Sequence, residues 1–188
     1  MFGELVANKH INQKNINCLP IGFKSGISYR NEIKKRKFKW SFIGTPHRSS
    51  RHDLLFHFSK IKPCFTFQTK RFSGFKDKQK IIEVDEMSRI LSSTSFVPCP
   101  NGTYHPETYR LYEALECQCI PIIENAYNYY DRLLPGNPFL KANKWLDAKE
   151  IITNWTHEQI TKKRAECSFW CNQYKLNLQE KISKKVKL

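Results

Sequence analysis

Apolar and polar residues alternate in blocks through the middle of the chain, and the blocks predict a strand, a helix and a second strand. Ser95–Cys99 is short, apolar and β-prone, and Pro100–Thr103 carries turn-forming residues. A helix is predicted from Pro106, where a missing N–H is tolerated, to about Cys117, with three residues facing inward: Tyr109, Tyr112 and Leu115. Cys119–Ile123 is a continuous apolar run, typical of a strand covered on both faces. Together these blocks predict one βαβ unit.

The same alternation occurs upstream. Lys37–Ile43 is the first predicted strand, and Gly44 breaks it before a predicted helix over Ser49–Lys60. A further strand is predicted over Pro63–Gln68 and a further helix over Ile81–Leu91. Strands that alternate with helices predict a parallel sheet. The expected fold class is therefore α/β, a Rossmann-like, doubly wound and mainly parallel sheet with a long C-terminal helix.

That last helix has a clear start and a clear stripe. Thr156, with Gln159 three residues later, forms a capping-box pattern that opens a helix after a short one over Asp147–Asn154. Apolar residues then recur at spacings of three and four: Cys167, Cys171, Tyr174, Leu178, Ile182 and Val186. We expect the first turns of this stripe to cover the sheet and the remainder to be exposed.

The elements predict three parts of the chain. Residues 1–30 are expected to be an entry segment, 31–155 a Rossmann-like domain and 156–188 a basic amphipathic helix. Within the second part, residues 125–145 are rich in aromatic and turn-forming residues and are expected to pack over the carboxyl edge of the sheet.

Composition narrows the class of protein. The chain has 188 residues, of which 40% are hydrophobic and 13% aromatic, which suffices for one domain with a core. The formal net charge is +15, and Lys and Arg concentrate in residues 30–39 and at the C-terminus. Neither cluster is interleaved with base-stacking aromatic residues, so we do not expect a nucleic acid as partner. Solvated faces are the expected explanation, with an anionic partner or peripheral membrane contact as the alternative.

The cysteines indicate neither a disulfide framework nor a metal site. The seven cysteines form no Cys-x-x-Cys pair and several lie in apolar strands, so buried, reduced thiols are expected. Cys167 and Cys171 share a helix face, but no matching pair of ligands accompanies them, and we expect no metal. No secretory signal and no apolar run of about 18 residues, the length that spans a membrane, are visible. A complete chain would be cytoplasmic.

Three charged residues of the central helix are candidates for binding. Glu107, Arg110 and Glu113 are spaced three apart, on one side of a helix that follows a glycine-containing turn. Free N–H groups and the helix dipole favour an anion there, and Arg110 adds a planar fork that suits a phosphate. Carboxylates accept hydrogen bonds from sugar hydroxyls. Together these groups suit a nucleotide sugar, but the spacing alone favours the alternative, a solvated ion-pair ladder.

The stretch PCPNGTYHPETYRLYEALECQCIPII resembles the donor-binding segment of exostosin-like glycosyltransferases and, more broadly, of glycosyltransferases with the GT-B fold. The matching residues are, in order, Arg110, Glu113, Ala114, Leu115, Cys119, Ile120, Pro121 and Ile122. Gln118 departs from the pattern, because the family commonly has glycine there. If that glycine makes a left-handed turn, Gln118 must adopt the same conformation at some cost.

The resemblance implies the C-terminal, nucleotide-sugar-binding half of a GT-B fold, with the acceptor-binding half supplied elsewhere. Its implied donor-binding residues are Gly44, Arg48, Arg51, Asn101, Gly102, Thr103, Glu107, Arg110 and Glu113. The diphosphate would be held by Gly44, Arg48, Arg51 and the 101–103 turn, with Arg110 assisting. Glu113 would bind sugar or ribose hydroxyls. Glu107 would approach the donor sugar and is the candidate catalytic residue. The alternative for Arg48 and Arg51 is the start of a surface helix.

The same resemblance implies transfer, with inversion, to a glycan or other hydroxyl acceptor. No cofactor is expected beyond the donor, a UDP-sugar, and no catalytic base is assigned because that group can lie on the other half. A fragment of a longer, membrane-anchored enzyme would lie in the Golgi lumen. The alternative function is a non-catalytic basic module that binds a polyanion, such as sulfated glycan, RNA or lipid headgroups, with strong salt dependence.

Overall fold

A parallel β-sheet forms the centre of the molecule. The computed structural model describes residues 19–23, 25–46, 49–69, 82–102, 105–124 and 126–186. The sheet has five strands in the order β2-β1-β3-β4-β5, and every neighbouring pair is parallel. The strands are β1 (Phe38–Gly44), β2 (Cys64–Gln68), β3 (Thr94–Cys99), β4 (Ile120–Glu124) and β5 (Leu140–Ala142). The predicted α/β, Rossmann-like fold is confirmed.

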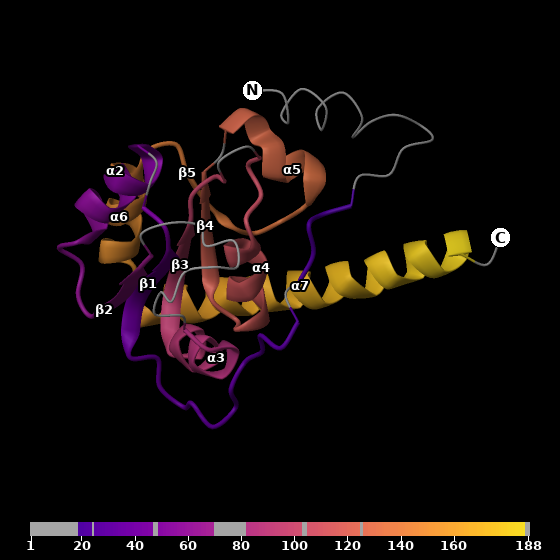
Figure 1. Cartoon of the computed structure of the whole chain (residues 1–188), viewed down its shortest axis with the longest axis horizontal. Helices are drawn as coiled ribbons and strands as arrows, with labels where there is room; N and C mark the ends of the chain where they lie inside the picture. Colours follow the sequence, from indigo (N-terminus) through magenta and orange to yellow (C-terminus); the bar gives the residue numbers. More distant parts are fainter. Residues whose placement is uncertain are drawn as a thin grey trace.

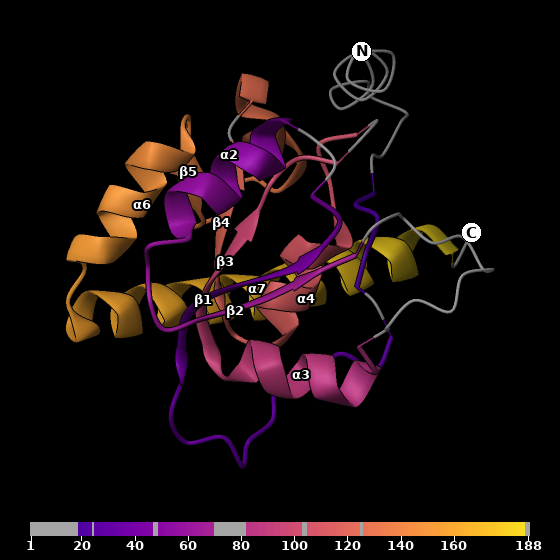
Figure 2. The ribbon, with the colours of Figure 1, turned by 60° about the vertical axis from the view of Figure 1, so that its left-hand side comes forward.

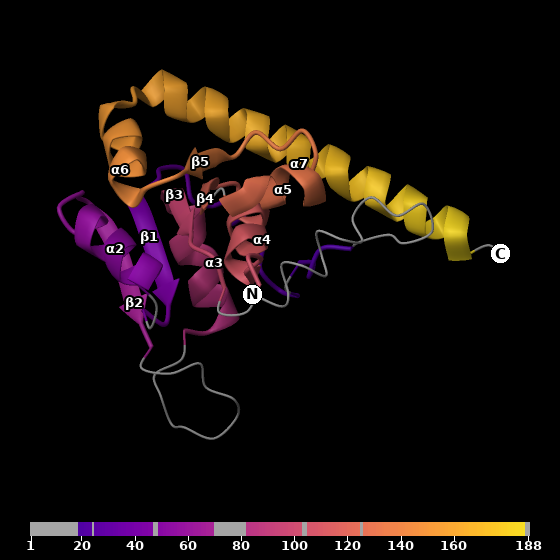
Figure 3. The same cartoon turned by 90° about the horizontal axis from the view of Figure 1, so that it is seen from above.

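Helices cover both faces of the sheet (Figures 1 and 3). One face carries α2 (Ser49–Phe58) and α6 (Trp145–Asn154), which lie side by side in Figure 2. The other carries α3 (Val84–Ser92), α4 (Tyr109–Glu116) and the long α7 (His157–Val186). The short elements η1 (Ala126–Asn128) and α5 (Tyr129–Leu133) lie at the carboxyl edge of the strands. Residues of the 125–145 segment therefore cover that edge, as predicted.

The core lies between the sheet and its helices, because the central strands are buried along almost their whole length. On β1, Trp40 and Phe42 are fully buried, and the indole N–H of Trp40 donates to the Ile61 carbonyl at 2.9 Å. Burying each large apolar side chain contributes about 1.5–3 kcal/mol. The continuous apolar runs of the sequence thus become the two-sided interior of a parallel sheet.

One arginine of the basic 30–39 cluster is part of the scaffold. Arg36 donates through Nη2 to the carbonyls of Cys117 and Gln118, at 3.0 and 2.9 Å, and through Nη1 to that of Leu91 at 3.2 Å. It therefore satisfies carbonyls at the C-terminal ends of α3 and α4, which have no partner within their helices. The expectation of a solvated face is wrong for this residue.

The start of α4 differs from the prediction. Thr108 is extended, with φ −136° and ψ 147°, so the helix begins at Tyr109 and Pro106 lies before it. Tyr109 is 55% exposed, whereas Leu111 and Tyr112 are buried. The predicted inward position of Tyr109 is wrong, because Tyr109 is the first residue of the helix and the arc that packs on the sheet begins at Leu111 and Tyr112.

The C-terminal helix follows the prediction closely. Thr156 and Gln159 form the capping box: the Thr156 N–H donates to Gln159 Oε1 at 2.8 Å, and the Gln159 N–H to Thr156 Oγ1 at 3.2 Å. Cys167 and Cys171 are buried against the core, whereas Ile182 is 44% exposed. The end of α7 projects past the sheet (Figures 1 and 3). The stripe therefore covers the sheet with its first turns only.

Gln118 stands where the resembling family commonly has glycine, and its backbone conformation shows whether that substitution is strained. Its φ is 55°, so it adopts the left-handed conformation that the resemblance required. Replacement by glycine should raise the free energy of unfolding by about 1 kcal/mol, because glycine has no Cβ to clash in this region. Chemical denaturation of wild type and Gln118→Gly measures the difference. Gln118→Ala is the control: it removes the side chain but keeps the Cβ, so an equal gain there would exclude backbone strain as the cause.

Candidate functional site

The sheet has its switch point between β1 and β3, since the chain leaves these two neighbouring strands in opposite directions. Their ladder pairs Phe38 with Thr94 and Trp40 with Phe96 and then stops. Both strands continue, to Gly44 and Cys99, without further pairing to each other, while β1 still pairs with β2 and β3 with β4. Open α/β sheets bind ligands in the crevice at this point, outside the carboxyl ends of the strands.

Arg110 of α4 reaches the place where β1 and β3 stop pairing, which we call the crevice. Its Nε and Nη2 donate to the Ile43 carbonyl at 3.3 and 2.8 Å, and its Cζ lies 4.6 Å from the centre of the Phe42 ring. The next carbonyl of β1, that of Gly44, accepts from Thr69 on the β2 side. Because successive carbonyls of a strand point to opposite sides, the Ile43 carbonyl points toward β3. Arg110 takes the oxygen that a continuing ladder would have used.

One nitrogen of this guanidinium is left over. Nη1 of Arg110 is buried and has no hydrogen-bond partner within the part of the chain that the structure describes. Burial lowers the pKa of Arg110, and the neighbouring Cys99 and Glu113 oppose that effect. A buried donor without a partner costs about 1–3 kcal/mol, and more when it is charged. The crevice therefore favours an anion that accepts from Nη1.

Gly44 is required by the arginine. A Cβ on Gly44 would collide with Nη2 of Arg110. The φ of Gly44 is 147°, a backbone conformation that residues other than glycine rarely adopt. The glycine at the end of the first strand therefore lets the guanidinium approach the backbone. The structure brings Gly44 and Arg110 together, as the sequence predicted from separate segments.

Arg51 joins the two loops that border the crevice. It extends from α2, is only 8% exposed, and donates through Nη1 to the Thr45 carbonyl at 2.8 Å and through Nη2 to the Asn101 carbonyl at 3.4 Å. The alternative of a surface helix start is thereby excluded for this residue. Its charge lies between the carboxyl ends of β1 and β3.

The turn after β3 is held by its backbone. A Cβ on Gly102 would meet the His105 carbonyl at 2.5 Å and the Glu107 carbonyl at 3.1 Å, so only glycine fits this close approach. The N–H of Asn101 donates to Glu124. Its side-chain Oδ1 is buried and has no partner among residues described by the structure. The turn thus offers one buried acceptor, Oδ1 of Asn101, to a ligand at the crevice.

Glu124 is a site residue that the sequence analysis missed. It ends β4, and its two carboxylate oxygens accept from the Ser50 hydroxyl of α2 and from the Asn101 N–H. Trp145, at the start of α6, donates to the same Ser50 hydroxyl at 3.1 Å. One carboxylate therefore fixes α2 and the turn after β3. An acidic residue at the carboxyl end of a buried strand was the available signal, because that is the ligand edge of such a sheet.

Glu107 is a buried carboxylate with several donors. Its side chain is 3% exposed. Oε1 accepts from the Tyr112 hydroxyl and, at 3.2 Å, from the Ile21 N–H of the entry segment, and Oε2 accepts from the Tyr129 hydroxyl at 3.4 Å. The alternative of a solvated ion-pair ladder is excluded, because Glu107 and Glu113 are each only 7% exposed. The approach of Glu107 to a donor sugar stays a prediction.

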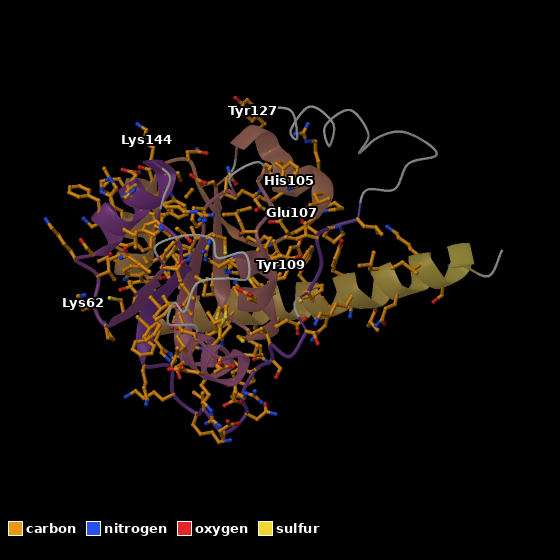
Figure 4. All side chains as sticks on the ribbon, in the orientation of Figure 1. Lys62, His105, Glu107, Tyr109, Tyr127 and Lys144 are labelled. Atoms are coloured by element: carbon orange, nitrogen blue, oxygen red, sulfur yellow. The ribbon has the colours of Figure 1, made fainter. Side chains whose placement is uncertain are left out.

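His105 is the second residue that the sequence analysis did not select. Its side chain is 36% exposed and its ring contacts Tyr129 edge to face, with centroids 5.3 Å apart. Figure 4 shows His105 above Glu107 near the carboxyl edge, with Tyr127 beyond them at the outer end. Histidine followed by proline in a turn carries no spacing pattern, so only the folded chain shows that it lies beside Gly102.

A comparison with protein-family models decides the relationship of the chain. The model of the RXYLT1 C-terminal domain matches residues 24–187. The chain belongs to this family. It is a glycosyltransferase-like family, which supports the resemblance drawn from the central motif. Comparisons with curated proteins and with solved structures gave no match.

Two predicted donor-binding residues, Arg48 and Thr103, lie outside the described part of this family member. No cluster of metal ligands is found within the described ranges. Burial raises the pKa of the Cys99 thiol to about 12, so this cysteine is not a thiolate nucleophile. No helix in the described chain is long and apolar enough to cross a membrane.

Gly44→Ala tests the packing of the crevice. We expect it to lower the free energy of unfolding by about 2–4 kcal/mol, since it adds backbone strain and displaces the guanidinium from Phe42 and Ile43. Gly22→Ala is the matched control: Gly22 also has a positive φ, of 87°, but a Cβ at that position would meet nothing within 4 Å. Equal losses in thermal denaturation of both variants would show that strain alone, and not the collision with Arg110, explains the effect.

Proposed function

We propose that this domain binds the nucleotide diphosphate of a UDP-sugar at the β1/β3 switch point and is the donor half of an exostosin-like, GT-B glycosyltransferase. The observation that carries the proposal is the buried Nη1 of Arg110, which lacks a partner among the described residues. A guanidinium held by Ile43 and Phe42 is oriented before any ligand arrives, so little ordering is needed on binding.

The surrounding groups suit a diphosphate. Arg51 adds a second cation between the same two strand ends, and Gly44 and Gly102 let backbone and ligand approach closely. Negative charge builds on the departing nucleotide diphosphate during glycosyl transfer, and pre-oriented cations stabilise it without a metal. Glu113 is the proposed hydrogen-bond acceptor for ribose or sugar hydroxyls.

Transfer to a hydroxyl acceptor needs a general base, and we assign none in this chain. We propose that a separate acceptor-binding half completes the active site and that the transfer inverts the anomeric centre, as the exostosin-like resemblance implies. The family is one of Golgi glycosyltransferases, so the proposed location is the Golgi lumen. The same family description makes UDP-xylose the first donor to test.

The polyanion alternative loses part of its basis. Arg36 is committed to helix-end carbonyls, and Arg30 pairs with Asp85 at 2.6 Å, so the 30–39 cluster presents fewer free cations than the sequence implied. A polyanion would bind exposed cations, and this alternative does not explain why Arg110 is held at the Ile43 carbonyl.

Calorimetric titration of the folded domain with UDP-xylose tests the proposal. We expect saturable binding, and Arg110→Lys should weaken it about tenfold or more, because a lysine cannot span both Ile43 and a phosphate. Arg89→Lys is the matched control: Arg89 is exposed and pairs with Asp85 on α3, so its affinity should stay within about twofold.

Two results would contradict the proposal. One is a folded wild-type domain that binds none of UDP-xylose, UDP-glucose and UDP. The other is binding that Arg110→Lys leaves unchanged. Retention on heparin that falls steeply with salt, without nucleotide binding, would favour the polyanion module instead.

A further inference from the structure

Asn101 lies in the turn after β3, and its backbone is held on both sides. Its N–H donates to Glu124 at the end of β4, and its carbonyl accepts from Nη2 of Arg51 at 3.4 Å. Nη1 of the same arginine donates at 2.8 Å to the carbonyl of Thr45, the residue after β1. Arg51 therefore joins this turn to the strand end at which Arg110 is bound.

The same turn is close to the start of α4, which carries Arg110. A Cβ on Gly102 would meet the methyl group of Thr108 at 3.5 Å, and Thr108 is the N-cap residue of α4. Cys99, the last residue of β3, is close enough to Arg110 to oppose the lowering of its pKa by burial. Asn101, Thr108 and Arg110 therefore lie around one turn.

Three buried polar atoms around this turn have no hydrogen-bond partner in the described ranges: Oδ1 of Asn101, Oγ1 of Thr108 and Nη1 of Arg110. Thr108 does not use its hydroxyl to cap the helix that it precedes. Buried polar atoms in folded proteins nearly always have partners. Three such atoms on neighbouring segments therefore favour a polar ligand.

A diphosphate alone does not match these three atoms. The guanidinium can only donate, the amide oxygen can only accept, and the hydroxyl can do both. The ionised oxygens of a diphosphate suit Nη1 of Arg110, but they offer no proton to Oδ1 of Asn101. That oxygen needs an O–H or N–H group, and a nucleotide sugar carries hydroxyls on both sides of its diphosphate.

We propose that Asn101 is a specificity-determining residue, whose side-chain oxygen accepts a hydrogen bond from a hydroxyl of the nucleotide sugar while Arg110 binds its phosphate. This inference rests on the proposed function. The hydroxyl belongs either to the ribose or to the transferred sugar, and both offer the same chemistry. Glu124 is a positioning residue in this scheme, because it accepts from the N–H of Asn101.

An acceptor that is fixed in this way gives selectivity. Because Glu124 and Arg51 hold the Asn101 backbone, little ordering of the turn is needed when the ligand binds. A site built to bond a hydroxyl rejects a ligand that lacks it, since the buried oxygen is then left without a partner. The same diphosphate without that hydroxyl should therefore bind more weakly.

A series of three ligands tests this assignment. Wild type and Asn101→Ala are titrated by calorimetry with UDP-xylose, UDP and 2′,3′-dideoxy-UDP, which lacks the ribose hydroxyls. The titrations are made at pH 8, because a terminal phosphate with a pKa near 6 is then ionised and offers no proton. Loss of one hydrogen bond should weaken the binding of UDP-xylose to Asn101→Ala by about three- to tenfold.

The ligands that do not respond to the variant identify the hydroxyl. If the ribose supplies it, Asn101→Ala weakens the binding of UDP-xylose and of UDP but not of dideoxy-UDP. If the transferred sugar supplies it, the variant weakens the binding of UDP-xylose alone. Either result supports the role of Asn101.

A matched variant and the wild-type series serve as controls. Asn172→Ala changes an exposed asparagine of α7 and should bind all three ligands as wild type does. Thermal denaturation shows whether Asn101→Ala is folded. Should it not fold, the wild-type titrations still decide, because equal affinity for the three ligands would mean that no hydroxyl is recognised and would overturn the proposal.

Two further results would overturn the role of Asn101 and leave the donor site standing. Equal weakening of all three ligands by Asn101→Ala would mean that the amide contacts the phosphate or the base. Unchanged affinity for all three is the result expected if a bound water, and not the ligand, satisfies Oδ1. A folded wild type that binds none of the three ligands overturns both proposals.

Discussion

The buried guanidinium of Arg110 is the constraint on which the site depends. It occupies the gap where β1 and β3 stop pairing, takes the Ile43 carbonyl and rests on the Phe42 ring. Such a charge is costly inside a protein unless its donors are satisfied, and Nη1 has no partner among the described residues. The collision that excludes a side chain at Gly44 follows from the same placement. The unmet donor and the excluded side chain thus have one origin, the position of this guanidinium beside the end of β1.

Much of the fold could be predicted because it depends on periodicity. The apolar runs of β1, β3 and β4 and the capping box at Thr156 each predict an element from local residues alone. The three-residue β5 has too few positions for a pattern, and its pairing with β4 depends on the whole sheet. The start of α4 was misplaced because Pro106 is equally suited to the turn that precedes a helix.

The site was predictable only where a motif spans several residues. Gly44, Arg110 and the Asn101–Gly102 turn come from separate segments, and strand order alone brings them together. Glu124 and His105 are single residues without a spacing pattern, and their roles depend on contacts with α2 and α5. Glu107 was selected for its charge, yet its buried carboxylate accepts hydrogen bonds from a tyrosine hydroxyl and a backbone N–H. Sequence identifies the chemistry available, and packing decides which groups face the crevice.

Glu107 also connects the site to the segment through which the chain enters the domain. The Ile21 N–H donates to the carboxylate oxygen that Tyr112 also contacts, and the Phe23 ring packs edge to face on Tyr112 at 5.1 Å. The other oxygen of the same carboxylate accepts from Tyr129. Without the Ile21 N–H, the carboxylate of Glu107 would keep only its two tyrosine donors among these contacts, and a buried acceptor that loses a donor is costly. One buried carboxylate thus joins the entry segment to α4 and α5.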